Sequence, residues 1–286
     1  MRFFQVDVFA GKAYEGNPLA VFPEADGLAK VQMQAIAREM NLSETAFVTG
    51  RTSDSYDVRI FTPARELPFA GHPTIGTAWV LRRLGILTED DATQRSAAGE
   101  TEVVAHGEMI WFRRSGRAGD DLQARDPCFA RRAAGALAIG EAEIELEARE
   151  LGRSGHLRPA LADAGLEPLI VPVRDLESLG RIAPLPDAVA ALPGMGVYCF
   201  TAAGAGRIRA RGFFPEVGIL EDPATGSAAA ALGLYLDRRI GSIDLNVTQG
   251  VEIGRRSLLH VRAGSGRVEI GGRCAFVFEA SLSAIP

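Results

Sequence analysis

The chain has 286 residues, of which 47% are hydrophobic, and its formal net charge at pH 7 is −5. This length and composition are typical of a globular protein with two domains, each large enough to bury its own core. Because the chain is acidic and has no long lysine- or arginine-rich cluster, its composition argues against nucleic-acid binding.

The N-terminus and one uncharged segment bear on membrane association and export. Asp7 stands where a signal peptide would need its apolar centre, so residues 1–7 are interpreted as the beginning of a first strand. Residues 188–206 carry no charge, but Pro193 and several glycines interrupt them, which favours a loop followed by a buried strand. We therefore expect no membrane association.

The three cysteines, Cys128, Cys199 and Cys274, are odd in number and widely separated. This spacing indicates neither a disulfide framework nor a zinc site. A reducing cytoplasm is the expected location, and no metal is predicted.

Short strands with alternating apolar residues are predicted in the first half of the chain. Their ranges are 4–9, 19–22, 45–48, 58–61, 101–105 and 109–112. Two amphipathic helices are predicted at residues 29–40 and 73–84. The second is apolar nearly all round before Arg82, which indicates a buried helix with a sheet wrapped around it.

Between residues 113 and 165 the pattern dissolves into Ala, Gly, Glu and Arg, which predicts a linker or a poorly ordered domain entry. A domain boundary near residue 115 gives domains at 1–115 and 116–274. Beyond this segment a second buried helix is predicted at 227–239, where four consecutive alanines favour helix. Strands are predicted at 169–173, 197–201, 207–214, 245–248, 258–261, 268–270 and 275–280.

The two buried helices belong to a repeated pattern of a strand, Phe-x-Pro, a loop and a glycine that opens the helix. The first copy contains Phe61-Thr62-Pro63 and Gly71, and the second contains Phe213-Phe214-Pro215 and Gly226. Two such units in one chain predict two related domains that face each other, with a site in the cleft between them.

Each helix opens with a turn of small residues, Ala70-Gly71-His72-Pro73 in one copy and Thr225-Gly226-Ser227-Ala228 in the other. Glycine lets a ligand approach the backbone, and the first-turn N–H groups with the helix dipole attract an anion. The two turns are thus candidates for binding a substrate carboxylate. The alternative is that each glycine merely makes the turn.

Three side chains are candidates for acid–base chemistry or for positioning a substrate. His72 lies at a helix N-terminus, where the dipole favours a neutral imidazole. Asp222 precedes the second helix and serves either as a cap or turn residue or to orient His72. Glu44 shares a strand face with Ala46 and Val48, so desolvation would raise the pKa of its carboxyl group and suit it to proton transfer.

Glu66 competes with Glu44 for the acid–base role on composition alone. It lies in the loop after Phe61-Thr62-Pro63, where its alternative role is to brace that loop. An edge position with access to solvent is likewise the alternative reading of Glu44.

Six motifs of the chain together resemble the PhzF (phenazine biosynthesis) family. They are Asn17-Pro18-Leu19-Ala20-Val21-Phe22, Asn41-Leu42-Ser43-Glu44-Thr45, Phe61-Thr62-Pro63, Glu66-Leu67-Pro68-Phe69-Ala70-Gly71-His72-Pro73, Glu221-Asp222-Pro223-Ala224-Thr225-Gly226-Ser227 and Gln249-Gly250-x-Glu252-Ile253-Gly254-Arg255. The resemblance implies the diaminopimelate epimerase-like fold, an α+β fold of two pseudo-symmetric domains, each a mixed β-sheet around a central buried helix. In that fold the last strand, here about residues 275–286, returns to the first domain.

The resemblance also implies an isomerase that needs no cofactor and forms a homodimer. A glutamate at the position of Glu44 moves a proton between two carbons of a small anionic substrate. Residues matching His72, Asp222 and Ser227 surround that substrate, and the turns at Gly71 and Gly226, the latter with Thr225, bind its carboxylate.

Related epimerases and racemases have a cysteine before each helix-opening glycine, where this chain has Ala70 and Thr225. A two-thiol racemisation is therefore excluded, and a proton shift is predicted. The substrate is left open, since one fold hosts different chemistries. A metabolite-binding protein without turnover and an epimerase of unknown substrate are the alternatives.

Overall fold

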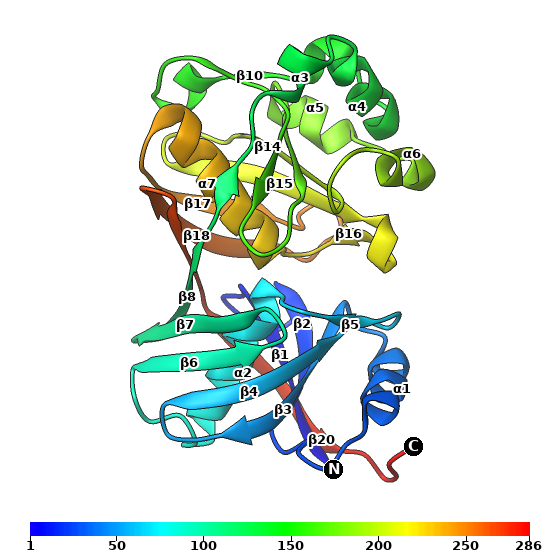
Figure 1. Ribbon diagram of the computed structural model, residues 1–286, viewed down its shortest axis with the longest axis vertical. Helices are drawn as coiled ribbons and strands as arrows, with labels where there is room; N and C mark the ends of the chain where they lie inside the picture. The colour runs from blue at the N-terminus through cyan, green and yellow to red at the C-terminus, as the bar shows by residue number, and fades with distance from the viewer. The chain divides into compact units, whose positions relative to one another are not determined.

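The computed structural model describes residues 1–286, which divide into two compact units. Unit 1 comprises Met1–Arg113 and Gly271–Pro286, and unit 2 comprises Arg114–Ile270. Figure 1 shows the elements of both units, each of which is described by itself below. No helix in the protein is long and apolar enough to cross a membrane.

Unit 1 is a mixed β-sheet with two helices. Its elements are β1 (Arg2–Val8), β2 (Asn17–Phe22), α1 (Lys30–Met40), β3 (Glu44–Arg51), β4 (Ser55–Phe61), β5 (Glu66–Leu67), α2 (Gly71–Arg83), β6 (Asp91–Ser96), β7 (Gly99–His106), β8 (Met109–Ser115, which runs into unit 2 at Arg114) and β20 (Cys274–Ser281). The strands pair in the order β20–β1–β2–β3–β4–β6–β7–β8, with β5 also on β4. The β2–β3 and β4–β6 pairs are parallel and the others antiparallel.

Helix α2 is the centre of unit 1, and the sheet curves around it (Figure 1). Nearly all of its residues are buried, and it contacts β1, β2, β3, β7 and β20. At Gly76 the helix approaches the sheet so closely that an added Cβ would lie 2.5 Å from Leu19 and 2.7 Å from Val8. Burial on all sides explains why this segment is apolar all round.

Helix α1 packs over a second core of unit 1, which contains a run of stacked phenylalanines. Phe22 stacks on Phe3 and on Phe47, with ring centroids 5.1 and 4.9 Å apart, and Phe61 meets Phe47 edge to face. Met33, Ile36 and Ala37 of α1 complete this core. Asn41 then ends the helix in a left-handed conformation (φ 51°) and turns the chain into β3.

Unit 2 is also a mixed sheet with a buried helix, to which several short elements are added. Its elements are β9 (Arg117–Ala118), α3 (Leu122–Arg125), α4 (Phe129–Leu137), η1 (Glu141–Glu143), β10 (Leu146–Glu147), η2 (Ala148–Leu151), β11 (His156–Leu157), β12 (Ala160–Asp163), β13 (Leu169–Pro172), α5 (Leu176–Arg181), α6 (Pro186–Ala190), β14 (Val197–Ala202), β15 (Arg207–Phe214), η3 (Pro215–Val217), β16 (Ile219–Asp222), α7 (Gly226–Ile240), β17 (Ile243–Gln249), β18 (Ser257–Gly264) and β19 (Arg267–Gly272, which runs into unit 1 at Gly271). The order β9–β12–β13–β14–β15–β17–β18 is set by pairing, with β16 also on β15.

Helix α7 takes the central place in unit 2. Its four alanines, Ala228 to Ala231, are fully buried, and the helix contacts β9, β12, β13, β17 and β18. Gly233 faces Val268 and Val261 at the closest approach to the sheet. Each unit is therefore a mixed sheet around a buried helix, which confirms the predicted α+β class.

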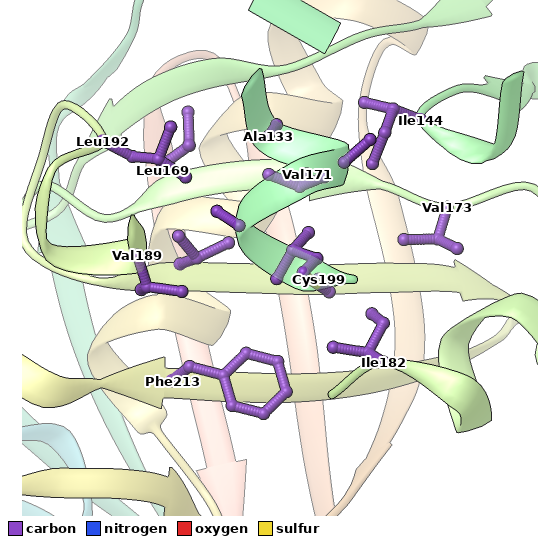
Figure 2. Packing of buried hydrophobic residues seen from close by; sticks show 14 of the residues in the cluster. Ala133, Ile144, Leu169, Val171, Val173, Ile182, Val189, Leu192, Cys199 and Phe213 are labelled. Atoms are coloured by element: carbon purple, nitrogen blue, oxygen red, sulfur yellow. The ribbon is translucent and has the colours of Figure 1, made fainter. Parts of the chain in front are cut away.

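The expectation of a linker or poorly ordered entry between residues 113 and 165 was wrong. This segment contains α4, which packs on the outer face of the unit 2 sheet in one core with Val171, Cys199 and Phe213 (Figure 2). The buried face of α4 consists largely of alanines, including Ala133. The helix spans only nine residues, which is shorter than the window over which an apolar periodicity stands out from its surroundings.

Candidate active site

The starts of three elements of unit 1 bring polar side chains together in its buried interior. Glu44 opens β3, Asn17 opens β2, and His72 is the second residue of α2. The parallel register of β2 and β3 places Glu44 opposite Leu19, two residues after Asn17. These side chains are thus held by strand pairing and by the buried helix, not by flexible loops.

The imidazole of His72 is the centre of this group. Its Nδ1 lies 3.4 Å from Oε2 of Glu44 and 3.3 Å from Nδ2 of Asn17. Ser43 donates a hydrogen bond of 2.8 Å to Oδ1 of Asn17. The exposed fractions are 8% for Glu44, 2% for His72 and 0% for Asn17. A carboxyl group, an imidazole and an amide therefore share one desolvated site.

Burial lowers the pKa of His72 from 6.5 to about 3, so the ring is neutral near pH 7. The prediction of a neutral ring rested on the helix dipole, whereas desolvation is the main cause. The other ring nitrogen, Nε2, is buried and has no hydrogen-bond partner within the protein. A neutral imidazole with one unused nitrogen can donate or accept one hydrogen bond to a bound molecule.

Glu66 occupies a different environment from Glu44. Its carboxylate accepts two hydrogen bonds from Arg59, of 2.7 and 2.9 Å, and lies 2.8 Å from Nζ of Lys30. The hydrogen bond from Arg59 is the main cause that lowers the pKa of Glu66. An ionised carboxylate fully engaged with two cations is suited to bracing the strand pair β4–β5, which was the alternative role foreseen for it.

The corresponding position of unit 2, at the start of α7, contains another polar group. Oδ2 of Asp222, the last residue of β16, accepts a 2.6 Å hydrogen bond from the hydroxyl of Thr225, which precedes Gly226. The side chain of Gln249 donates to the Asp222 carbonyl (2.8 Å) and to Oγ1 of Thr225 (3.1 Å). Its Oε1 accepts from the Thr225 N–H (3.1 Å) and the Tyr198 hydroxyl (2.8 Å).

The structure thus groups the predicted residues within their own units. Glu44 and His72 lie together in unit 1 beside the turn at Gly71, and Asp222, Thr225, Gly226 and Ser227 lie together in unit 2. No group of three or more His, Cys, Asp or Glu side chains is placed to hold a metal ion.

Four polar residues of these groups had no role assigned from the sequence: Asn17, Ser43, Tyr198 and Gln249. All but Tyr198 lie inside a motif that resembles the PhzF family, so a signal was present at those three positions. Gln249 ends β17 directly before Gly250, whose φ is 74°. A buried polar residue beside such a turn is expected to form hydrogen bonds, but the sequence does not show with which residue.

The chain matches known proteins along nearly its whole length. The sequence pattern of the phenazine biosynthesis-like proteins (PhzC-PhzF) matches residues 6–280. The trans-2,3-dihydro-3-hydroxyanthranilate isomerase of Pseudomonas chlororaphis is 37% identical over 282 residues, which cover 93% of this chain and 94% of the relative.

Solved structures agree with this match. The structure of a predicted epimerase from Pseudomonas aeruginosa superimposes with a TM-score of 0.82 at 30% identity, covering 99% of each chain. A hydroxyproline epimerase from Agrobacterium vitis, at 14% identity and a TM-score of 0.61, covers 98% of this chain and 91% of its own. The latter shows likeness of fold alone.

The two mixed sheets with buried helices and these structural matches define a protein of the diaminopimelate epimerase-like fold and of the isomerase class. Within that class, the chain belongs to the phenazine biosynthesis-like (PhzC-PhzF) family.

Proposed function

We propose that this protein is a cofactor-independent isomerase that shifts a proton within a small carboxylate-bearing metabolite, with Glu44 as the general acid–base group. The observation that carries the proposal is the pair formed by a buried Glu44 and a neutral His72, with Oε2 and Nδ1 3.4 Å apart. A desolvated carboxyl group exchanges protons near neutral pH more readily than an exposed one.

The reaction needs one group that both removes and returns a proton. As a carboxylate, Glu44 accepts a proton from one substrate carbon and leaves a delocalised anion. As a carboxylic acid, it returns the proton to a second carbon on the same face. Substrate and product are then isomers, and Glu44 ends in the form in which it began. This step needs no cofactor, because the proton is all that moves.

We assign His72 to positioning the substrate, since its Nε2 has no partner within the protein and can bond a substrate oxygen. We assign the same positioning role to Asp222, so the proposed catalytic residues are Glu44, His72 and Asp222. Thr225 and Ser227, with the backbone at Gly71 and Gly226, would bind the substrate's polar groups. Helix N-termini favour anions, which supports a carboxylate as one of these groups.

A proton shift is preferred to inversion at one carbon. Two-base inversion requires groups on opposite faces of the carbon, and the residues before the helix-opening glycines are Ala70 and Thr225. Neither side chain exchanges protons near neutral pH. The trans-2,3-dihydro-3-hydroxyanthranilate isomerase relatives support this preference and supply a first compound to test.

We expect the protein to act in the cytoplasm as a homodimer. The expected location rests on the odd number and wide spacing of its three cysteines. The expected assembly rests on the resemblance to the PhzF family.

The test compares Glu44→Gln with Glu66→Gln, a matched change in the same unit. Both variants and the parent protein are incubated with trans-2,3-dihydro-3-hydroxyanthranilate in D₂O, and NMR follows the isomeric product and deuterium uptake. Glu44→Gln keeps the shape but loses the acid–base group, so turnover should fall by about 10²–10⁴-fold. Glu66→Gln should retain it.

Undiminished product formation and deuterium uptake by Glu44→Gln would overturn the assignment. If the compound is not converted, a panel of small amino and hydroxy acids is screened by thermal shift and deuterium uptake. If compounds of the panel bind but none of them takes up deuterium, the non-catalytic alternative is favoured. Inversion at a single carbon would favour an epimerase.

A further inference from the structure

The hydrogen bonds at His72 bear on which ring nitrogen carries the proton. A neutral imidazole has one N–H and one lone pair, and the partner of one nitrogen sets the state of the other. Nδ1 faces two groups, the amide of Asn17 at 3.3 Å and the carboxyl group of Glu44 at 3.4 Å. The state of Nδ1 thus depends on which of these groups presents a hydrogen.

The amide of Asn17 is oriented by Ser43. The Ser43 hydroxyl donates to Oδ1 of Asn17 at 2.8 Å, so the carbonyl end of the amide is engaged there. The amino end, Nδ2, is left facing Nδ1 of His72. An amide N–H is a donor only, and it therefore requires a lone pair on Nδ1.

We propose that Asn17 is a positioning residue that holds His72 in the tautomer with its proton on Nε2. Ser43 supports this by fixing the orientation of the Asn17 amide. The buried Nε2 without a partner then presents an N–H donor, which suits a carbonyl or carboxylate oxygen of a substrate.

The same tautomer acts on Glu44. With a lone pair on Nδ1, a protonated Glu44 can donate a hydrogen bond to the ring, whereas an ionised Glu44 would place negative charge against that lone pair. The carboxylic acid that Glu44 becomes after the first proton transfer is thus the form that the ring can hold by a hydrogen bond. This catalytic consequence rests on the proposed function, whereas the tautomer does not.

The tautomer is measured by ¹⁵N NMR of protein labelled selectively at its histidines. The chain has four histidines, and His72→Gln identifies the signals of His72 by their loss. In the parent protein at pH 7, we expect a protonated, pyrrole-type shift at Nε2 and a pyridine-type shift at Nδ1. A protonated Nδ1 in the parent protein would overturn the proposal whether or not a substrate is known.

Asn17→Asp tests the direction of control. Its carboxylate has the same shape but only accepts, so it should draw the proton to Nδ1 and reverse the two shifts. Gln94→Glu is the matched control, because Gln94 is an equally buried amide of unit 1 that bonds Tyr56. It should leave the His72 shifts unchanged. Unchanged shifts in a folded Asn17→Asp would contradict the proposal.

Ser43→Ala tests whether Ser43 orients the Asn17 amide. It also provides a second test of the proposal if the Asn17→Asp variant does not fold. It removes the anchor of the amide without touching His72, so the shifts should move toward a mixture of tautomers. Where turnover is available, kcat should fall by about tenfold, the effect of losing roughly one hydrogen bond. Parent-like shifts together with parent-like kcat in a folded Ser43→Ala would remove Ser43 from the proposal.

Discussion

The starts of the two central helices differ in how their polar groups are used. At the start of α2, His72 has a buried Nε2 with no partner within the protein. At the start of α7, both ends of the Gln249 amide are engaged, with Tyr198, Thr225 and the Asp222 backbone. His72 therefore has bonding capacity left for a ligand, whereas the Gln249 amide uses its capacity to hold the turn that contains Thr225.

This difference shows how a repeated unit can acquire two tasks. The repeat supplies a glycine turn and a buried helix in both units, and neighbouring strands supply side chains that differ. In unit 1, β3 supplies the carboxyl group of Glu44, which can exchange protons, and in unit 2, β17 supplies the Gln249 amide, which rigidifies the turn. Such a buried network, when fully satisfied, specifies a single local structure.

The first prediction breaks the network of unit 2. Gln249→Leu leaves the Tyr198 hydroxyl, the Thr225 N–H and the Asp222 carbonyl without their shared partner. At the low end of the about 1–3 kcal/mol typical of each buried group that loses its partner, the local stability around α7 should fall by at least about 3 kcal/mol. Native-state hydrogen exchange should show faster exchange in α7 than in the parent protein, with α2 unchanged.

Gln249→Glu is the control for this prediction, since it keeps the size of the side chain and its acceptor oxygen. At a pH low enough to keep the new carboxyl group uncharged, it should preserve the bonds to Tyr198 and the Thr225 N–H and cost less than the leucine variant, because no buried charge is then created. Equal protection of α7 in Gln249→Leu and the parent protein would show that the network does not hold the helix start.

The second prediction concerns the pH dependence of unit 1. In the folded protein His72 stays neutral down to about pH 3, whereas in the unfolded chain it takes up a proton below about pH 6.5. The unfolded state therefore binds more protons in this window, and stability falls as the pH falls. Between pH 6.5 and 4 this contribution is about 3 kcal/mol.

Urea unfolding at several pH values measures this contribution. Both tryptophans, Trp79 and Trp111, lie in unit 1, so their fluorescence reports its unfolding. The acid loss of stability should be about 3 kcal/mol smaller in His72→Gln than in the parent protein. His156→Gln, which changes an exposed histidine of unit 2, should track the parent protein. Parallel pH profiles for His72→Gln and the parent protein would contradict a neutral buried ring.

Much of this arrangement can be predicted from the sequence alone, because the residue types at several positions indicate that the position is buried. The two buried helices stand out because they are apolar all round, and Glu44 stands out as a carboxyl group on an apolar strand face. Helix α4 is not predicted because its nine residues are fewer than the window over which an apolar periodicity stands out. Its packing against β13 and β14 depends on surfaces from distant parts of the chain.

The partners in the two sites are harder to predict than the candidates themselves. Asn17 meets His72 across 55 residues of sequence, and Gln249 meets Thr225 across 24. These contacts follow from strand register and from the depth at which each helix is buried. A motif reports that a residue type is present, whereas its hydrogen-bond partner is decided by the fold.

The last prediction compares how closely the two helices pack on their sheets. In Gly76→Ala the new Cβ would lie 2.5 Å from Cδ2 of Leu19 and 2.7 Å from Cγ2 of Val8, closer than such contacts allow. In Gly233→Ala the nearest atoms, in Val268 and Val261, are at 2.8 and 3.0 Å. Overpacking typically costs about 1–3 kcal/mol of stability. The higher helix propensity of alanine than of glycine offsets about 1 kcal/mol of this cost.

We therefore expect Gly76→Ala to lower the stability of unit 1 by about 1–2 kcal/mol, measured by tryptophan fluorescence in urea. Gly233→Ala should lower the stability of unit 2 by less than about 1 kcal/mol, measured by hydrogen exchange of α7. The smaller cost follows because its contacts are longer and the helix gain is the same. A larger loss for Gly233→Ala would reverse the comparison and place the tighter helix–sheet packing in unit 2, the unit without the acid–base pair.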